Sequence, residues 1–212
     1  MPIHCPDFEI LLDYASGNLP VAPSVTIAVH SSMCFECNNI LKSIDTAGAV
    51  LIDDLPIVEL DTNSLDNVLS RLDNDPFSHS DENIVSNIKF QVPIPKVLKP
   101  YIPNDLNWIK LSSGVKILEL LSSDGFKLNI YKILPGYTIP KHTHTGNEFT
   151  LVFDGGFTDG NKHFGPGDFS LLDHNSDHSP KADLGKDCYC IVAMNSKIKF
   201  TGTFSKFLNF LN

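Results

Sequence analysis

Three side chains that can ligate a metal lie within seven residues of one another: His142, His144 and Glu148. On a strand, alternate side chains point to the same face, so His142 and His144 share a face while Thr143 points the other way. The residues Thr145-Gly146-Asn147 are typical of a turn, after which a second strand would begin at Glu148 and return its carboxylate to the two histidines. Two imidazoles and a carboxylate that converge in this way are three ligands of a mononuclear metal site.

A fourth ligand is expected from a strand further along the chain. The stretch Phe164-Gly165-Pro166-Gly167-Asp168 has the composition of a turn, a short apolar strand follows it, and His178 comes ten residues after Asp168. Together with the first stretch, this pattern resembles the two sequence motifs of the cupin family. The resemblance implies a small antiparallel β-barrel with a metal ion inside, held by His142, His144, Glu148 and His178. The alternative is a hairpin with these side chains on the surface.

A second group of metal-capable residues lies near the N-terminus, where His30, Cys34 and Cys37 follow the pattern His-x3-Cys-x2-Cys. Spacings of four and three residues bring side chains to one side of a helix, or to the facing ends of two helices if the chain bends. Thiolates together with an imidazole favour zinc, which usually takes four tetrahedral ligands. We expect the fourth ligand to be His4 or Cys5. A redox pair of the two cysteines is the alternative, but it leaves His30 without a role.

The elements that must position these groups differ between the two parts of the chain. Several segments in the first part have the apolar spacing of helices. Pro20 and Pro23 predict a break between the first two of them, after which Ser24 is a candidate N-cap. A later helix carries an apolar stripe, which would pack into the domain's own core or into a groove on another protein; its residues are Leu65, Val68, Leu69 and Leu72.

The second part of the chain has the pattern of strands. Residues 76–97 are polar and then punctuated by prolines, which is typical of a linker. Strand patterns begin at Trp108, and a late strand places Cys188 and Cys190 on one face. We therefore predict an α+β protein with two domains. A zinc-binding helical domain occupies residues 1–75, and an antiparallel β-barrel of the cupin type occupies residues 98–212.

Composition narrows the class of protein. The N-terminus has no basic start or long apolar run, and no segment approaches the roughly 20 apolar residues of a membrane span, so we expect a cytoplasmic protein. Five cysteines in that setting indicate metal ligands or redox thiols rather than disulfides. The first 90 residues carry fourteen acidic and three basic side chains, whereas the remainder carry eleven and thirteen. An acidic half should repel nucleic acid and attract a basic protein surface, although it would also simply keep the protein soluble.

The order of the two parts, a zinc-type helical domain followed by a cupin, resembles the ChrR family of anti-sigma factors over nearly the whole chain. The matching residues are Leu11-Leu12-Asp13-Tyr14-Ala15-Ser16-Gly17, the His30, Cys34 and Cys37 triplet, Lys141-His142-Thr143-His144, Phe149-Thr150-Leu151-Val152, Phe164-Gly165-Pro166-Gly167-Asp168, His178-Ser179-Pro180 and Cys188-Tyr189-Cys190. The family's first zinc ligand is a histidine. Its position here is Cys5, with His4 one residue before, and a thiolate would serve zinc as well as an imidazole.

The resemblance implies a regulator that binds a sigma factor of the extracytoplasmic-function type and releases it on oxidative signals, singlet oxygen in particular. It is not expected to be an enzyme or to bind nucleic acid directly. The sigma factor would give the acidic surface and the stripe of Leu65, Val68, Leu69 and Leu72 a partner. The barrel would hold zinc, manganese or iron and act as the sensor, with Cys188 and Cys190 as redox candidates. The cysteines would otherwise be ordinary core residues, since thiols are often buried.

Two other classes of function fit parts of the pattern. Three histidines and a glutamate also hold iron or manganese in cupin dioxygenases and isomerases, which need an open coordination position and a substrate-sized pocket. A cupin can also be a metal-stabilised module that binds a sugar or another small molecule. An acidic zinc module in front of the barrel has no obvious use in catalysis, so the regulatory interpretation is favoured.

Overall fold

The computed structural model describes residues 1–73 and 90–202. The expected linker, residues 76–97, therefore lies outside the described residues except for 90–97. Within the described residues, four α-helices come first, and a 3₁₀-helix precedes the strands; their bounds are α1 Phe8–Ala15, α2 Val21–Met33, α3 Phe35–Asp53, α4 Ser64–Asp73 and η2 Lys96–Tyr101. Twelve strands follow in the described residues: β1 Ile109–Lys110, β2 Val115–Ser123, β3 Phe126–Ile133, β4 His142–His144, β5 Glu148–Asp154, β6 Phe157–Asp159, β7 Lys162–Phe164, β8 Phe169–Leu172, β9 Asp177–His178, β10 Lys181–Ala182, β11 Cys188–Met194 and β12 Ile198–Phe200.

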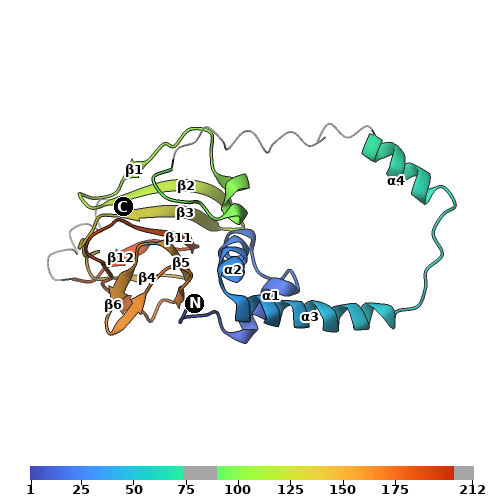
Figure 1. Ribbon diagram of the computed structural model, residues 1–212, viewed down its shortest axis with the longest axis horizontal. Coiled ribbons are helices and arrows are strands. Elements are labelled where there is room, and N and C mark those ends of the chain that lie inside the picture. The colour runs from blue at the N-terminus through green and yellow to red at the C-terminus, as the bar shows by residue number, and fades with distance from the viewer. Residues whose placement is uncertain (74–89, 203–212) are drawn as a thin grey trace.

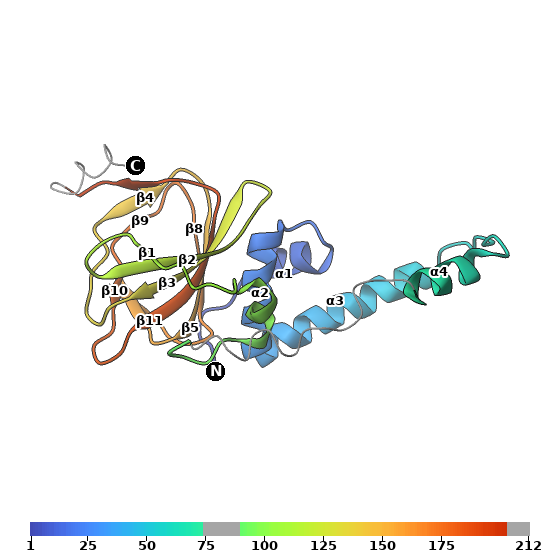
Figure 2. The same cartoon turned by 90° about the horizontal axis from the view of Figure 1, so that it is seen from above.

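The strands form the antiparallel barrel that the sequence predicts (Figures 1 and 2). One sheet has six strands in the order β1-β2-β3-β11-β5-β8, and two three-stranded sheets, β10-β6-β7 and β12-β4-β9, complete the structure. All neighbouring strands in these three sheets are antiparallel. The fold class, an N-terminal helical part and a C-terminal cupin-type barrel, is therefore confirmed.

Alternation along β11 shows how the six-stranded sheet is buried on both faces. Its even-numbered residues Cys188, Cys190 and Val192 belong to the apolar cluster inside the barrel. The odd-numbered residues, including Ile191, belong to a second cluster that also contains helical residues such as Leu11. Because both faces are covered, β11 has a nearly continuous apolar sequence rather than an alternating one.

Helix α2 is the element that joins the helical part to the barrel. It contacts β2, β3, β5 and β11, and it lies against the sheet in Figure 2. Most of its side chains are buried, including Val25, Ile27 and Val29. The helix begins at Val21, four residues before the expected start behind Ser24, so Pro23 lies in its first turn, where a missing N–H costs no helical hydrogen bond. The break that we expected at Pro23 is therefore wrong.

The described end of the expected linker is packed rather than free. Phe90, Val92, Ile94 and Val97 are partly buried against the same cluster that contains α2 and the outer face of the sheet. Phe90 also contacts Trp108, with ring centroids 6.1 Å apart. These four residues therefore belong to the packed body formed by α2 and the barrel, although their proline-rich sequence is typical of a linker.

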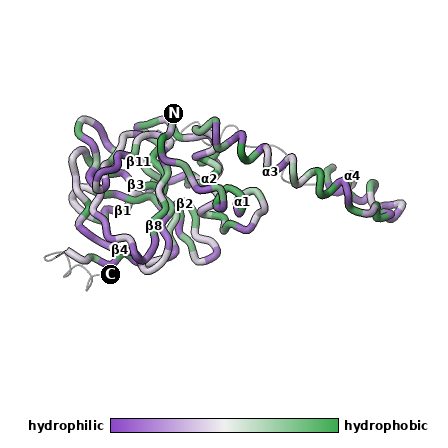
Figure 3. The backbone as a smooth tube through the Cα atoms, turned by 90° about the horizontal axis from the view of Figure 1, so that it is seen from below, coloured by the Kyte–Doolittle hydropathy of each residue, from purple (hydrophilic) through white to green (hydrophobic). Residues whose placement is uncertain are grey.

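Helices α3 and α4 extend away from the barrel (Figures 1 and 2). Only Cys37 and Leu41 are buried in α3, and both lie in its first half. Large apolar side chains are exposed along the rest of this arm. Figure 3 shows hydrophobic residues among the polar ones along α3 and α4. Among the described residues, no helix is both long and apolar enough to cross a membrane.

Candidate metal centres

The N-terminal group consists of Cys5, His30, Cys34 and Cys37, whose ligand atoms all lie within 4.8 Å of one another. Cys5 comes from the extended segment before α1, His30 from the last turn of α2, Cys34 from the junction of α2 and α3, and Cys37 from the first turn of α3. The chain bends at Cys34, whose φ of −115° and ψ of 108° are extended, so the triplet is brought together by the facing ends of two helices.

The distances in this group suit a tetrahedral zinc ion. The Cys5 and Cys34 Sγ atoms are 3.8 Å apart, and His30 Nε2 lies 3.2 Å from Cys37 Sγ. A tetrahedron with zinc–sulfur bonds of about 2.3 Å has sulfur–sulfur edges of about 3.8 Å. The group is therefore able to bind a metal, and its three thiols and one imidazole are ligands that zinc prefers.

Burial favours the uncharged forms of Cys5, His30 and Cys37 in the N-terminal group. It raises the pKa of the Cys37 thiol far above its usual value, and the hydrogen bonds that this thiol makes with Cys5 and Cys34 act in the same direction. Burial also lowers the pKa of His30, whose Nδ1–H donates to the Gly167 carbonyl at 2.8 Å. That bond fixes the tautomer with a lone pair on Nε2, which faces the three sulfurs.

His4 lies outside the N-terminal group, although it was one of our two candidates for the fourth ligand. Its ring packs on Phe164 with centroids 4.6 Å apart, and its Nε2 donates to the His163 carbonyl at 3.0 Å. Consecutive residues of an extended segment point in opposite directions, so His4 turns to the barrel while Cys5 turns to the helices. The structure thus brings Cys5, and not His4, to the other three residues.

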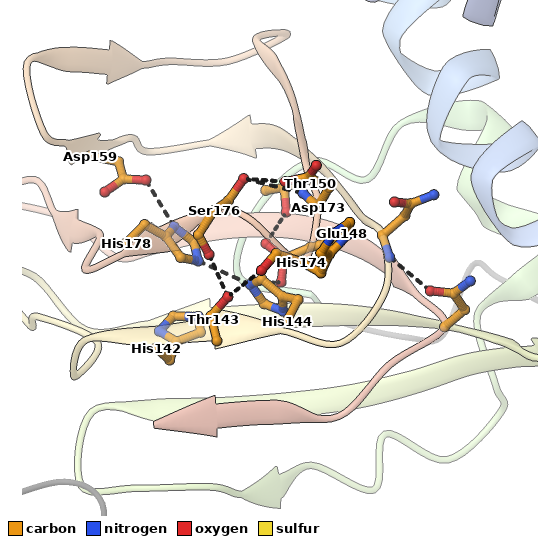
Figure 4. A network of polar contacts seen from close by, with 12 residues as sticks. His142, Thr143, His144, Glu148, Thr150, Asp159, Asp173, His174, Ser176 and His178 are labelled. Atoms are coloured by element: carbon orange, nitrogen blue, oxygen red, sulfur yellow. Dashed lines mark hydrogen bonds and ion pairs between the residues drawn. The ribbon is translucent and has the colours of Figure 1, made fainter. Parts of the chain in front are cut away.

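The barrel group consists of His142, His144 and His178, whose ligand atoms also lie within 4.8 Å of one another. The first two are on β4 and the third is on β9, and the register of these strands pairs His142 directly with His178. Figure 4 shows the three rings turned toward one another inside the barrel. The period-two argument for His142 and His144 therefore describes the observed geometry.

Hydrogen bonds fix the tautomers of two of these rings. His142 Nδ1–H donates to the Pro140 carbonyl, and His178 Nδ1–H donates to Asp159 Oδ2, both at 2.8 Å. Their Nε2 atoms therefore carry lone pairs. His178 Nε2 and His144 Nε2 are 3.1 Å apart, close to the edge of about 3 Å between neighbouring ligands in an octahedron with bonds of about 2.1 Å. These residues fit a metal ion with nitrogen and oxygen ligands.

Glu148 is beside the three histidines but at the margin of the group. Its Oε2 lies 3.4 Å from His144 Nε2, and its Oε1 accepts a hydrogen bond from Thr150 Oγ1 at 2.9 Å. Burial raises the pKa of Glu148, although the charge of His178 opposes the shift. A cation bound to the histidines would favour the carboxylate form, so Glu148 stays a candidate ligand.

Burial favours the neutral form of two of the barrel histidines, His142 and His144. Burial, with repulsion from His178, lowers the pKa of both His142 and His144 to about 4. A neutral imidazole is the form that binds a metal. His144 Nδ1 is buried with no hydrogen-bond partner among the described residues.

Cys188 and Cys190 point into the barrel, where they pack with Tyr131 and Val152. The neighbouring Cys188 raises the pKa of Cys190, and burial and Glu148 act in the same direction. A buried thiol with a raised pKa lacks the thiolate character of a reactive cysteine. The geometry of these two residues is therefore that of core thiols close to the barrel ligands.

The apolar stripe on α4 lies on the surface. Its four residues have exposures of 68% for Leu65, 55% for Val68, 48% for Leu69 and 65% for Leu72. Of the two interpretations that the sequence left open, packing into the domain's own core does not describe them. Solvent-exposed apolar side chains at helical spacing are typical of a helix that binds a partner.

Sequence reasoning missed the residues that support the ligands. Asp159 orients His178, and the Gly167 carbonyl orients His30. Neither contact has a sequence signal, because each joins segments that are far apart in the chain. Asp168 was visible only as part of a turn motif, yet its carboxylate accepts hydrogen bonds from the backbone of the N-terminal segment.

Comparison with known proteins identifies relatives of the whole chain. Residues 101–197 match the family model of the ChrR cupin-like domain. The chain is 30% identical over 205 residues to the anti-sigma-E factor ChrR of Cereibacter sphaeroides, covering 93% of this chain and 92% of that protein. Its structure is similar to that of ChrR in the crystal structure of Rhodobacter sphaeroides SigE in complex with the anti-sigma ChrR. The TM-score is 0.75 at 29% identity, covering 92% of this chain and 99% of the other.

Proposed function

The chain belongs to the ChrR family of anti-sigma factors, and we propose that it binds and inhibits a sigma factor of the extracytoplasmic-function type. The observation that carries this proposal is the similarity to ChrR along 93% of the chain. In addition, this chain brings together two groups of residues that are able to hold a metal. The relative's structure was solved in complex with its sigma factor, SigE. Family membership makes the protein a regulator and not an enzyme, and we infer that it acts in the cytoplasm, where sigma factors meet RNA polymerase.

We propose that the helical part, within residues 1–75, is the inhibitory region. A zinc ion held by Cys5, His30, Cys34 and Cys37 would fix the end of α2 to the start of α3. Because structural zinc binding is coupled to folding, the ion would set the direction in which α3 leaves the packed body. The exposed stripe of α4 would then meet the sigma factor, with the acidic surface of this region against basic residues of the partner.

We propose that the barrel, within residues 98–212, is the sensor. His142, His144, Glu148 and His178 would hold zinc, manganese or iron, which would supply a positive charge that keeps the four side chains together. Imidazoles and thiols are side chains that oxidants attack, so singlet oxygen entering the barrel would damage a ligand or Cys188 or Cys190. Oxidation at the metal-loaded site would distort the barrel and, through the core that it shares with α2, lower the affinity for the sigma factor.

Complex formation tests the inhibitory role directly. The full chain would be co-expressed with each extracytoplasmic-function sigma factor of its source genome, and complexes would be separated by size-exclusion chromatography. One sigma factor is expected to co-elute with the chain in equimolar amount and to fail to bind core RNA polymerase while the chain is present. If none co-elutes, or if the bound sigma factor still joins the polymerase, the proposed function is wrong.

A further inference from the structure

The first residues of the chain are bound to one turn of the barrel. Asp168 Oδ1 accepts hydrogen bonds from the backbone N–H groups of Ile3, at 2.5 Å, and His4, at 2.9 Å. The backbone N–H of Phe169 donates in return to the His4 carbonyl at 2.9 Å. With the ring of His4 on Phe164, these contacts fix the backbone on the N-terminal side of Cys5.

Asp168 is a buried carboxylate whose hydrogen bonds, among the described residues, all come from backbone N–H groups. Its exposed fraction is 4%, and its second oxygen, Oδ2, accepts from the backbone N–H of Gly165 at 2.8 Å. Replacing such a carboxylate leaves several buried N–H groups without an acceptor, which is costly for the segment that carries them. Two of these N–H groups, those of Ile3 and His4, belong to the N-terminal segment, so loss of the carboxylate should loosen this segment in particular.

The same turn also contacts another ligand of the N-terminal group. The Gly167 carbonyl accepts from His30 Nδ1, so it orients the imidazole whose Nε2 faces the sulfurs. Gly167 has a φ of +91°, and a Cβ built on it would lie 2.6 Å from Pro2 Cγ and 3.5 Å from Met33 Cβ. Only glycine therefore allows the turn to approach both the N-terminal segment and the end of α2 this closely.

We propose that the Gly167–Asp168 turn of the barrel is a structural part of the N-terminal metal site, with Asp168 as the positioning residue for the Cys5 ligand. This inference rests on the proposed zinc site. It makes the metal affinity of the helical part depend on the barrel. It also means that a single strand, β8, connects the two metal sites. This strand begins at Phe169, next to the turn, and at its other end Leu172 pairs with Glu148 of the barrel site.

Cobalt binding to the full-length chain provides a test that is specific to this site. Thiolate ligands give cobalt(II) an intense charge-transfer absorption in the near ultraviolet, whereas the nitrogen and oxygen ligands of the barrel group do not. Cys34→Ser should abolish the band, which would assign it to the N-terminal site. The metal-free protein would be titrated with cobalt alone, and zinc affinity would then be measured by its displacement of cobalt.

Asp168→Ala is expected to bind cobalt and zinc at the N-terminal site about 10-fold or more weakly, since removal of outer-shell support typically costs 10–100-fold in affinity. Asp154→Asn is the matched control, because it removes the same charge from a barrel carboxylate whose partner is Lys186. It should leave the cobalt affinity unchanged. Binding of metal by the barrel histidines, followed by isothermal titration on a Cys34→Ser background, should be the same with and without Asp168→Ala.

Two results would overturn the inference. One is a folded Asp168→Ala protein with wild-type cobalt affinity and spectrum. Another is an equal loss of affinity at both metal sites, which would show that Asp168 stabilises the barrel in general and does not position Cys5 specifically. If Asp168→Ala does not fold, as judged by circular dichroism, the isosteric Asp168→Asn decides on the same criteria. A wild-type protein without the thiolate band would instead refute the zinc site itself, a failure distinguishable from that of Asp168 alone.

Discussion

Leu65 and Leu72 offer a direct perturbation of the proposed sigma-factor surface. They are seven residues apart on α4, and they are 68% and 65% exposed. A leucine-to-alanine change removes three carbons, worth about 0.8 kcal/mol each when they are transferred from water to an apolar surrounding. If the partner covers the two-thirds that is now exposed, each change should weaken binding by about 1.6 kcal/mol.

The double variant Leu65→Ala/Leu72→Ala should therefore lose about 3 kcal/mol, or about 100-fold in Kd. The free protein should be nearly unaffected, because surface substitutions away from special features change stability by about 0.5 kcal/mol or less and alanine is a strong helix former. Kd would be measured by isothermal titration with the sigma factor that co-elutes with the wild-type chain, and stability by urea unfolding.

Leu184→Ala is the matched control, since this leucine is 83% exposed but belongs to the barrel. It should bind the sigma factor as the wild type does. Unchanged affinity in the double variant would refute the assignment of α4 to the interface. An equal loss of affinity in the Leu184→Ala control would show that the effect is not specific to α4. Exposure of apolar side chains on α4 would then not identify the interface.

Three further predictions concern the metal ligands. Cys34→Ser and Cys37→Ser should each remove zinc and loosen residues 1–73, as shown by metal analysis and by faster amide exchange; a variant that keeps zinc and protection would contradict the assignment. His142→Ala and Glu148→Ala should still bind the sigma factor but fail to release it under singlet oxygen, and normal release by both would remove the barrel metal from the mechanism. In the metal-free protein, burial holds the pKa of His142 and His144 near 4, whereas the pKa of an unfolded histidine is about 6.5. As the pH falls below about 6.5, the unfolded chain therefore binds protons at these positions before the folded protein does. The free energy of unfolding should therefore fall as the pH drops from about 6.5 toward 4; a flat dependence in urea titrations from pH 7 to 5.5 would count against neutral buried imidazoles.

Much of the barrel site could be predicted from local sequence. His142 and His144 share a face because strand periodicity is exact, and the turn before Glu148 limits where the next strand begins. The strand with Cys188 and Cys190 was also recognisable, since a short apolar run with both cysteines two residues apart has few other interpretations. In each case the information lies within a few residues of the chain.

What could not be predicted depends on contacts between distant segments. The choice between His4 and Cys5 is made by Phe164 and the His163 carbonyl, which attract the His4 ring to the barrel. The prolines at 93 and 95 suggested a linker, yet Phe90 and Ile94 pack on the shared core. The composition of a segment describes how it behaves in isolation. Here the apolar surface of α2 and the sheet binds residues 90–97, and this contact cannot be read from the segment's own sequence.

A reconstituted transcription assay tests the central claim most directly. It would contain core RNA polymerase, the co-eluting sigma factor, a promoter that this sigma factor recognises and the full-length chain. In the dark, an equimolar amount of the chain should abolish the transcript, and illumination with a photosensitiser that generates singlet oxygen should restore it. A transcript of undiminished intensity in the dark, with the chain in excess, would contradict the claim that this protein is an anti-sigma factor.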